Sequence, residues 1–380
     1  MSSIQRGKRS KYPGTKKRGS TWSYYLTLDG RKVWRGSYAT QKEAADARAA
    51  AQVEHKQGRF RHLSKATVGE YLAEAFLPAK QMAGVKPSTL ESYRQKVAVI
   101  QALPMGAMKV QAVRPTDVER MQQQLLQQGK APRTISYTTT VLSMALDHAL
   151  NVSGLIADNP AKRVKKPKPV RRTASLLTVD QMRQMLEATK DTEWEAFYRL
   201  ALFTGARRGE LLALRWSDVD WDAGTVTIRS NLVEVAGKPV ETTPKNGEAR
   251  VVTLDTATVL VLRAHRKNQA QARLEVGPYW KGDADSRVTV KGDGSDVAPK
   301  SASQHWARLR RRLGVPSQVR LHDSRHTHAT LLLEAGEPLH VVADRLGHKD
   351  ASVTSTVYAH VLRGQQDQAA ARFAEAVGLD

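Results

Sequence analysis

Apolar side chains follow two different periods along this 380-residue chain, and the first of them predicts a small sheet. From Trp22 to Leu28, large apolar residues alternate with a period of two, which is typical of a half-buried strand. Asp29-Gly30 is a strong turn signal, and Arg31 to Tyr38 follows as the returning strand. Thr40 and Glu43 then fit a capping box at the start of an Ala-rich helix. We therefore expect a three-stranded sheet backed by one helix.

From about residue 65 the apolar period becomes that of helices. Four helices are expected to begin near residues 67, 87, 115 and 132, each with Thr, Ser or Pro ahead of an apolar-periodic run. This helical bundle ends at Asn159-Pro160. The next stretch, Ala161 to Arg172, holds two prolines among many cations, which predicts a stiff, extended tether.

A third region begins with a capping box at Thr178 to Gln181, and an apolar helix follows that ends at Thr204-Gly205. Short strands are expected at 225–228, 232–235, 240–243 and 250–254, then a strand with loops within 277–300. Helices return from residue 303, and the last carries Ala370, Phe373, Ala374 and Val377 on one face. Whether that face packs on its own subunit or on a neighbour stays open.

These patterns predict a multidomain α+β protein. Its expected parts are a sheet-plus-helix domain at 1–62, an all-α helical bundle at 63–161, a basic linker at 162–174 and a mainly α domain with a small antiparallel sheet at 175–380.

The charge balance indicates a polyanionic partner. Lys and Arg number 60 against 37 Asp and Glu, so the formal charge is +23, and nucleic acid is the leading candidate. Arg31, Lys32 and Arg35 on the predicted hairpin could lie in a DNA groove, and Lys165 with Lys166 could follow a phosphate backbone. A solvated basic surface would have the same composition, so charge alone names no activity.

Cysteine is absent, which excludes disulfides and thiolate metal sites. No apolar run reaches the roughly 20 residues that span a bilayer, and the basic N-terminus is followed by no apolar signal region. A cytoplasmic protein with no membrane partner is expected.

Six polar residues in the third region could assemble a phosphate site. Histidine and arginine three residues apart share a helix face, and arginine can grip a phosphate with two parallel hydrogen bonds. A second arginine would add charge, lysine and histidine could move protons, and a tyrosine could attack the phosphorus. The candidates are Arg207, Lys245, His322, Arg325, His348 and Tyr358. His322 and His326 also have metal-ligand spacing, but we expect no metal there.

With these residues in this order, the chain resembles the tyrosine recombinases of the phage-integrase family. The family's motifs are matched by Thr204-Gly205-Ala206-Arg207-Arg208-Gly209-Glu210-Leu211, by Lys245 after Thr243-Pro244, by His322-Asp323-Ser324-Arg325-His326-Thr327, by Leu346-Gly347-His348 and by Tyr358-Ala359-His360. The bundle and the N-terminal sheet resemble the core-binding and arm-binding domains of integrases that bind two kinds of DNA site. The resemblance therefore covers nearly the whole chain.

The resemblance implies a reaction and its groups. Tyr358 would attack the scissile phosphate, leaving a 3′-phosphotyrosyl link and a free 5′-hydroxyl, while Arg207 and Arg325 hold the phosphate. Lys245 would be the general acid for the leaving oxygen. Free 5′-hydroxyls would then attack the partner duplex and pass through a Holliday junction.

Three further residues have implied roles. His322 would assist proton transfer, His348 would hydrogen-bond the phosphate, and Glu210 would support the site. Because the phosphotyrosine conserves bond energy, the resemblance implies no cofactor, ATP or obligatory metal. The implied partners are core-type and arm-type attachment sites in double-stranded DNA, three further copies in a homotetramer, a host DNA-bending protein and an excisionase.

Two departures from the family pattern bear on the site. Ser324 stands where an aliphatic residue is usual, and we expect it to affect packing more than chemistry. Ten residues from His348 to Tyr358 is a long step, so the segment of the nucleophile could be reshaped. Residues 288–290 match an expected strand only loosely. Two alternatives remain open, a type IB topoisomerase and a non-catalytic architectural DNA-binding protein.

Overall fold

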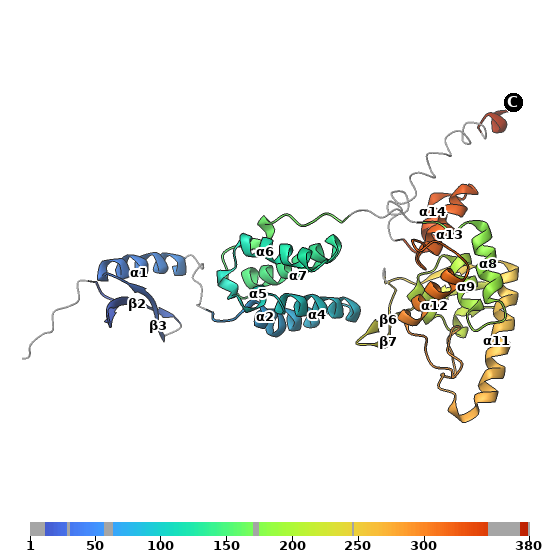
Figure 1. Ribbon diagram of the computed structural model, residues 1–380, viewed down its shortest axis with the longest axis horizontal. Helices are drawn as coiled ribbons and strands as arrows, with labels where there is room; N and C mark the ends of the chain where they lie inside the picture. Colours follow the sequence, from blue (N-terminus) through green and yellow to red (C-terminus); the bar gives the residue numbers. More distant parts are fainter. Residues whose placement is uncertain are drawn as a thin grey trace, which may run out of the picture. The chain divides into compact units, whose positions relative to one another are not determined.

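The computed structural model describes residues 12–28, 31–56, 64–169, 175–244, 247–348 and 373–378, which belong to two compact units divided between Val170 and Arg171 (Figure 1). Helices and small antiparallel sheets give a mixed, helix-rich α+β architecture, as expected. Among the described residues, no helix has the length and apolar character needed to cross a membrane.

The first unit begins with a three-stranded antiparallel sheet in the order β1 (Thr15–Arg18), β2 (Thr21–Leu28), β3 (Arg31–Tyr38). Helix α1 (Gln41–Lys56) covers one face, where Tyr24 and Leu26 of β2 pack with Ala51 of the helix. The backbone N–H of Glu43 donates to the hydroxyl of Thr40, so the predicted cap is present. The expected Asp29-Gly30 turn lies outside the described residues.

The helical part of this unit contains every helix start that the sequence predicts. Its elements are α2 (Val68–Tyr71), the π-helical turn η1 (Leu72–Phe76), α3 (Leu77–Met82), α4 (Pro87–Gln101), α5 (Pro104–Ala107), η2 (Val110–Ala112), α6 (Pro115–Gln127) and α7 (Pro132–Asn151). Thr67 caps α2 in a capping box with Glu70, while α4, α6 and α7 begin at proline. Their apolar faces enclose one core, with Leu72, Ile100 and Leu142 fully buried.

The beginning of the predicted linker is folded, so the prediction of an extended tether is wrong there. Residues Pro160–Arg163 form the 3-10 turn η3, which Asn159 caps by accepting from the backbone N–H of Ala161 at 2.9 Å. Val164 is only 7% exposed and joins the bundle core. Lys162 also pairs with Asp147 at 2.7 Å. One small and one branched apolar residue among the cations are enough to hold this stretch on the bundle.

The second unit is built around α9 (Glu195–Thr204), whose residues are mostly buried. The other helices are α8 (Val179–Thr189), α10 (Arg208–Ala213), α11 (Thr256–Val276), α12 (Pro299–Arg312), α13 (Asp323–Glu334) and α14 (Leu339–Leu346), with 3-10 turns η4 (Trp216–Asp218) and η5 (Gly277–Tyr279). Strands β4 (Val219–Asp220), β5 (Thr225–Ile228) and β8 (Arg250–Thr253) form one antiparallel sheet, and β6 (Asn231–Val235) pairs with β7 (Lys238–Thr242). Residues 373–377 are helical.

Two details of the second unit differ from the prediction. The single small sheet that was expected is divided into two, because β6 pairs with β7 through a turn at Ala236-Gly237 while β8 pairs with β5. Residues 277–300 contain η5 and the start of α12 with isolated bridges, such as Val290 with Asp296, instead of a regular strand.

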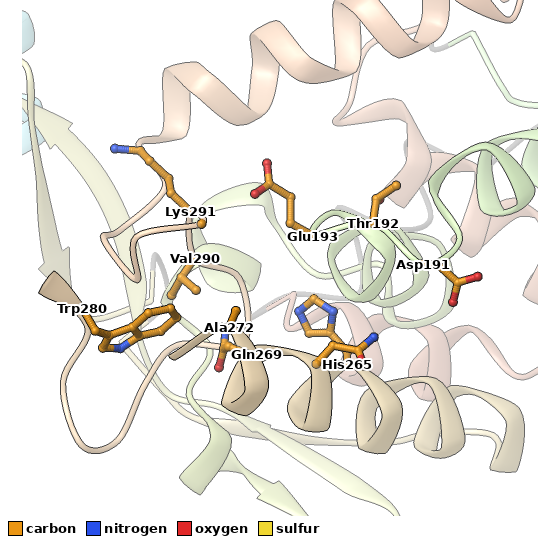
Figure 2. A pocket seen from close by; sticks show the side chains of 11 residues that line it. Asp191, Thr192, Glu193, His265, Gln269, Ala272, Trp280, Val290 and Lys291 are labelled. Atoms are coloured by element: carbon orange, nitrogen blue, oxygen red, sulfur yellow. The ribbon is translucent and has the colours of Figure 1, made fainter. Parts of the chain in front are cut away.

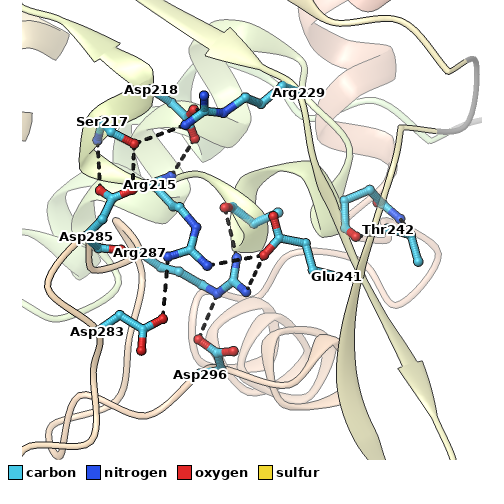
Figure 3. A network of polar contacts seen from close by, with 12 residues as sticks. Arg215, Ser217, Asp218, Arg229, Glu241, Thr242, Asp283, Asp285, Arg287 and Asp296 are labelled. Carbon is cyan, nitrogen blue, oxygen red and sulfur yellow. Dashed lines mark hydrogen bonds and ion pairs between the residues drawn. The ribbon is translucent and has the colours of Figure 1, made fainter.

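In residues 277–300, side-chain ion pairs take the place of regular strand pairing. Arg287 is 7% exposed and donates to the carbonyl of Ala213. It also pairs with Glu241 at 2.9 Å and with Asp296 at 2.8 Å (Figure 3). Glu241 lies on β7, so these ion pairs connect the β6–β7 hairpin to residues 277–300.

Candidate active site

Arg207 lies at the junction between α9 and α10. Gly205 ends α9 in the left-handed conformation at φ 62°, and Arg207 is the N-cap of α10. The Arg207 guanidinium donates to Oε1 of Glu210 at 2.8 Å, and its backbone N–H donates to Oε2 at 2.9 Å. The arginine side chain keeps 21% of its surface exposed, whereas that of Glu210 is fully buried. Glu210 therefore orients Arg207 while leaving part of the guanidinium accessible.

Arg325 joins three motifs that are far apart in the sequence. It lies in the first turn of α13 and is 3% exposed. Its guanidinium donates to the carbonyl of Gly205 at 2.8 Å and to that of Leu346 at 2.6 Å. Both carbonyls stand at helix ends, where backbone acceptors lack helical partners. The two arginine motifs and the Leu-Gly-His motif are consequently held at one place.

Gly205 is required there by close packing as well as by its backbone angle. A Cβ atom at this position would lie 2.8 Å from Cδ2 of His328 and from Cδ2 of Leu346. His328 is buried between the carbonyl of Leu202 and the guanidinium of Arg345. Burial and the charge of Arg345 lower the pKa of His328 to about 4, so it is a neutral packing residue at pH 7.

His348 follows the left-handed Gly347 that ends α14, and it is half-buried. Burial, then the charges of Arg325, Arg207 and Arg250, lower its pKa to about 4. The charges of guanidinium groups on three different elements therefore act on this ring, which stays neutral at pH 7. Such a concentration of cations is an anion-binding environment.

His322 is the N-cap residue of α13, one position before the helix, and it keeps an exposed edge. Its ring lies edge-on to that of His326, with centroids 5.2 Å apart. Partial burial, followed by the charges of His326 and Arg325, lowers the pKa of His322 to about 4. Within the described ranges, no three His, Asp or Glu side chains gather as a metal site would require.

Ser324, the departure from the family pattern, is buried and donates to the carbonyl of Leu321 at 2.7 Å. The hydroxyl is thus satisfied within its own turn, which fits the expected effect on packing. Two other predicted site residues, Lys245 and Tyr358, lie outside the described residues.

Sequence reasoning missed Arg250, the first residue of β8. Its guanidinium pairs with Oε2 of Glu210 at 2.6 Å and donates to the carbonyl of Arg345 at 3.0 Å. Burial acts to raise the pKa of Glu210, but its contacts with Arg250 and Arg207 outweigh burial and hold the pKa below its usual range. The only signal in the sequence is a cation at the start of a strand, and that signal carries no information about its partner.

The predicted DNA-contact residues of the N-terminal sheet differ in their surroundings. Lys32 is exposed and lies 4.9 Å from the ring centroid of Tyr25. Arg35 is half-buried and stands opposite Tyr24, so it shares the face that α1 covers. The side chain of Arg31 lies outside the described residues.

The two predicted linker lysines are both exposed. Lys166 donates to the hydroxyl of Thr140 on α7 at 3.0 Å, which anchors it on the bundle.

The second unit also has a cavity of about 190 Å³ that is separate from these residues. Figure 2 shows its lining, which comes from the middle of α11 and from two loops and includes Asp191, Glu193, His265 and Trp280. The described residues that line this cavity include no predicted site residue.

Comparison with known proteins supplies the family. Residues 175–364 match the model of the phage integrase family. A tyrosine recombinase XerC-like protein of Caldanaerobacter subterraneus subsp. tengcongensis is 27% identical over 302 residues, which cover 75% of this chain and 77% of the relative. The ICEBs1 integrase of Bacillus subtilis is 23% identical over 352 residues, covering 87% and 89%.

Solved structures share the fold. The Tn1549 transposon integrase in complex with a circular intermediate DNA superposes with a TM-score of 0.67 at 18% identity, covering 80% of this chain and 100% of that one. A lambda integrase tetramer bound to a Holliday junction gives 0.56 at 19% identity, covering 90% and 97%.

Proposed function

The chain belongs to the phage integrase family and is a tyrosine-type site-specific DNA recombinase, and we propose that Tyr358 is its nucleophile. The other groups around the scissile phosphate are Arg207, Lys245, His322, Arg325 and His348. The observation that carries this proposal is that Arg325 donates to the carbonyls of Gly205 and Leu346. These contacts bring the motifs of Arg207, Arg325 and His348, which are separate in the sequence, to one place.

We infer a phosphoryl transfer in which one phosphodiester is exchanged for another. The Tyr358 oxygen forms a bond to phosphorus, and the bond from phosphorus to the 5′-oxygen breaks. Arg207 and Arg325 balance the charge that grows on the non-bridging oxygens. Lys245 supplies the proton to the leaving 5′-oxygen, and the neutral imidazole of His322 assists by accepting the proton that the Tyr358 hydroxyl loses. Because one phosphodiester replaces another, the step needs no ATP.

His348 donates a hydrogen bond to a non-bridging oxygen. A neutral imidazole can donate through one nitrogen, and the low pKa of His348 keeps the ring neutral until an anion arrives. The free 5′-hydroxyl then attacks the phosphotyrosine of a partner duplex, and two such exchanges in a homotetramer pass through a Holliday junction.

The remaining parts of the chain bind the two kinds of DNA site. Residues 1–62 form the arm-binding domain, 63–161 with the folded stretch through Val164 the core-binding bundle, the residues after it to 174 a basic linker, and 175–380 the catalytic domain. A host DNA-bending protein and an excisionase complete the assembly. On the sheet, the face opposite α1 carries the aromatic pair Tyr25 and Trp34, with Lys32 over the first and Arg18, 4.6 Å from the ring centroid, over the second. This combination of rings and cations suits a phosphate backbone.

Lys32→Ala should weaken binding to arm-type duplexes and lower the slope of log affinity against log salt by about 0.9, the value for one lost phosphate contact. The matched control is Lys42→Ala, an exposed lysine on α1 that should leave affinity unchanged. Fluorescence anisotropy over a salt series measures both. Equal effects of the two variants would mean that the DNA does not bind at Lys32.

Deletion of residues 1–62 should leave cleavage of core-site duplexes intact. Loss of that cleavage would make the domain part of the catalytic machinery.

The function itself is tested with DNA from the ends of the element that carries the gene. Junction sequences from the integrated and circular forms are cloned on two plasmids and incubated with the purified protein without ATP. A recombinase joins the two plasmids at the junction sequences. Equal relaxation of a plasmid that lacks these sequences, without recombinants, would indicate a topoisomerase. Binding without any strand cleavage would indicate an architectural protein.

A further inference from the structure

Arg250 occupies the gap between the first arginine motif and the Leu-Gly-His motif. On one side it pairs with Glu210 at 2.6 Å, and on the other its Nε donates to the carbonyl of Arg345 at 3.0 Å. Its side chain is 11% exposed, so water competes little for either contact. A guanidinium has rigidly placed donors, and one such group can hold two acceptors in a fixed relation.

Glu210 connects Arg250 to Arg207. One carboxylate accepts the Arg207 guanidinium on Oε1, and both the Arg207 backbone N–H and Arg250 on Oε2. Since Glu210 is completely buried, removing either cation would leave its charge only half compensated. The position of Arg207 at the start of α10 therefore depends on Arg250 as well as on its own contacts.

The other contact of Arg250 fixes the turn that carries His348. The carbonyl of Arg345 is near the end of α14, where no helical N–H remains to satisfy it. Gly347 has φ 67°, and a Cβ there would lie 2.9 Å from Cδ and Nη1 of Arg250. The arginine thus lies directly against the glycine that precedes His348, and only a residue without a side chain leaves it room.

We propose that Arg250 is a positioning residue of the recombination site, which couples Arg207 through the shared Glu210 to the end of α14 and so holds Arg207 and His348 around one phosphate. This inference rests on the proposed function. In the structure, Arg250 contacts the groups that support Arg207 and His348, which are the Glu210 carboxylate and the Arg345 carbonyl. Its loss disturbs the rate of the chemical step more than the binding of DNA.

The test compares Arg250→Gln and Arg250→Lys with wild type on a nicked core-site duplex that traps the covalent adduct. We expect Arg250→Gln to lower the single-turnover rate of adduct formation by about a hundredfold, the cost of a displacement near 1 Å in a reacting group. The Kd for the duplex should stay within about threefold, because the phosphate contacts along the rest of the site remain. Arg250→Lys should recover part of the rate, since its ammonium can pair with Glu210 but cannot also hold the Arg345 carbonyl in the same geometry.

Arg199→Gln is the matched control for a general loss of stability. Arg199 pairs with Asp255 at 3.0 Å in the same unit and donates to Thr258. Within the described part of the chain, its contacts involve no site residue. The thermal midpoint of each variant shows how far its stability has fallen and whether it is folded at the temperature of the assay. We expect Arg199→Gln to lose stability and to keep the wild-type rate.

Coupling between Arg250 and Glu210 is measured with the double variant Glu210→Gln/Arg250→Gln. If both residues act through one carboxylate, the double variant is much less impaired than the product of the two single effects. A wild-type rate in folded Arg250→Gln, or equal losses in Arg250→Gln and Arg199→Gln, would overturn the positioning role while leaving the recombinase function intact. Absence of any adduct with wild type would overturn the proposed function and this inference together.

Discussion

Tyr358→Phe forms no covalent adduct with a nicked core-site duplex, whereas the wild-type protein accumulates one. Phenylalanine keeps the ring but lacks the oxygen that bonds to phosphorus, so the rate should fall by at least about a thousandfold, as when other nucleophiles are removed. The affinity for the duplex should remain within about twofold, because the contacts of the protein with the phosphate backbone are unchanged. Denaturing gel electrophoresis of end-labelled DNA detects the adduct, and mass spectrometry of the linked peptide identifies the residue.

Tyr279→Phe is the control for the nucleophile experiment. Tyr279 is 81% exposed on η5 and far in sequence from every motif, so its loss should leave adduct formation at the wild-type rate. An adduct that persists in Tyr358→Phe would show that another residue attacks the phosphate. The motifs from Arg207 to His348 would then act with a nucleophile other than Tyr358.

Arg325→Lys lowers the rate of adduct formation by about a hundredfold to a thousandfold, the range observed when one donor to a developing oxyanion is removed. The substitution keeps the positive charge but loses the planar fork. A single ammonium cannot hold the carbonyls of Gly205 and Leu346 and also hydrogen-bond a phosphate oxygen. Single-turnover cleavage under saturating enzyme separates this loss from any change in DNA affinity.

Arg287→Lys is the matched control, because Arg287 is another buried guanidinium in the same unit that donates to a backbone carbonyl, that of Ala213. Its carboxylate partners make it structural (Figure 3). Both variants should lower the thermal midpoint, and only Arg325→Lys should slow cleavage per folded molecule. If the two variants cleave at the same rate, Arg325 acts through packing alone and does not hold the phosphate.

Helix boundaries and the residues of the motifs were readable in the sequence because their signals are local. The capping box at Thr67 needs a partner only three residues away, and Gly205 ends its helix through its own backbone angle. The same reasoning failed for the stretch after Asn159. Cations and prolines indicated a tether, but burial of Val164 against the bundle depends on residues that precede it by more than a helix length.

The sequence by itself determined the family motifs of this protein and their order along the chain, since motif spacing is a property of the chain. Only the tertiary structure decided how they are held. Arg325 reaches carbonyls 120 and 21 positions away, and Arg250 meets Glu210 across 40 positions. No periodic pattern encodes such contacts, because they depend on how separate helices pack. The pairing of the buried Glu210 with two arginines, and the space that Gly347 leaves for Arg250, exist only once the chain has folded.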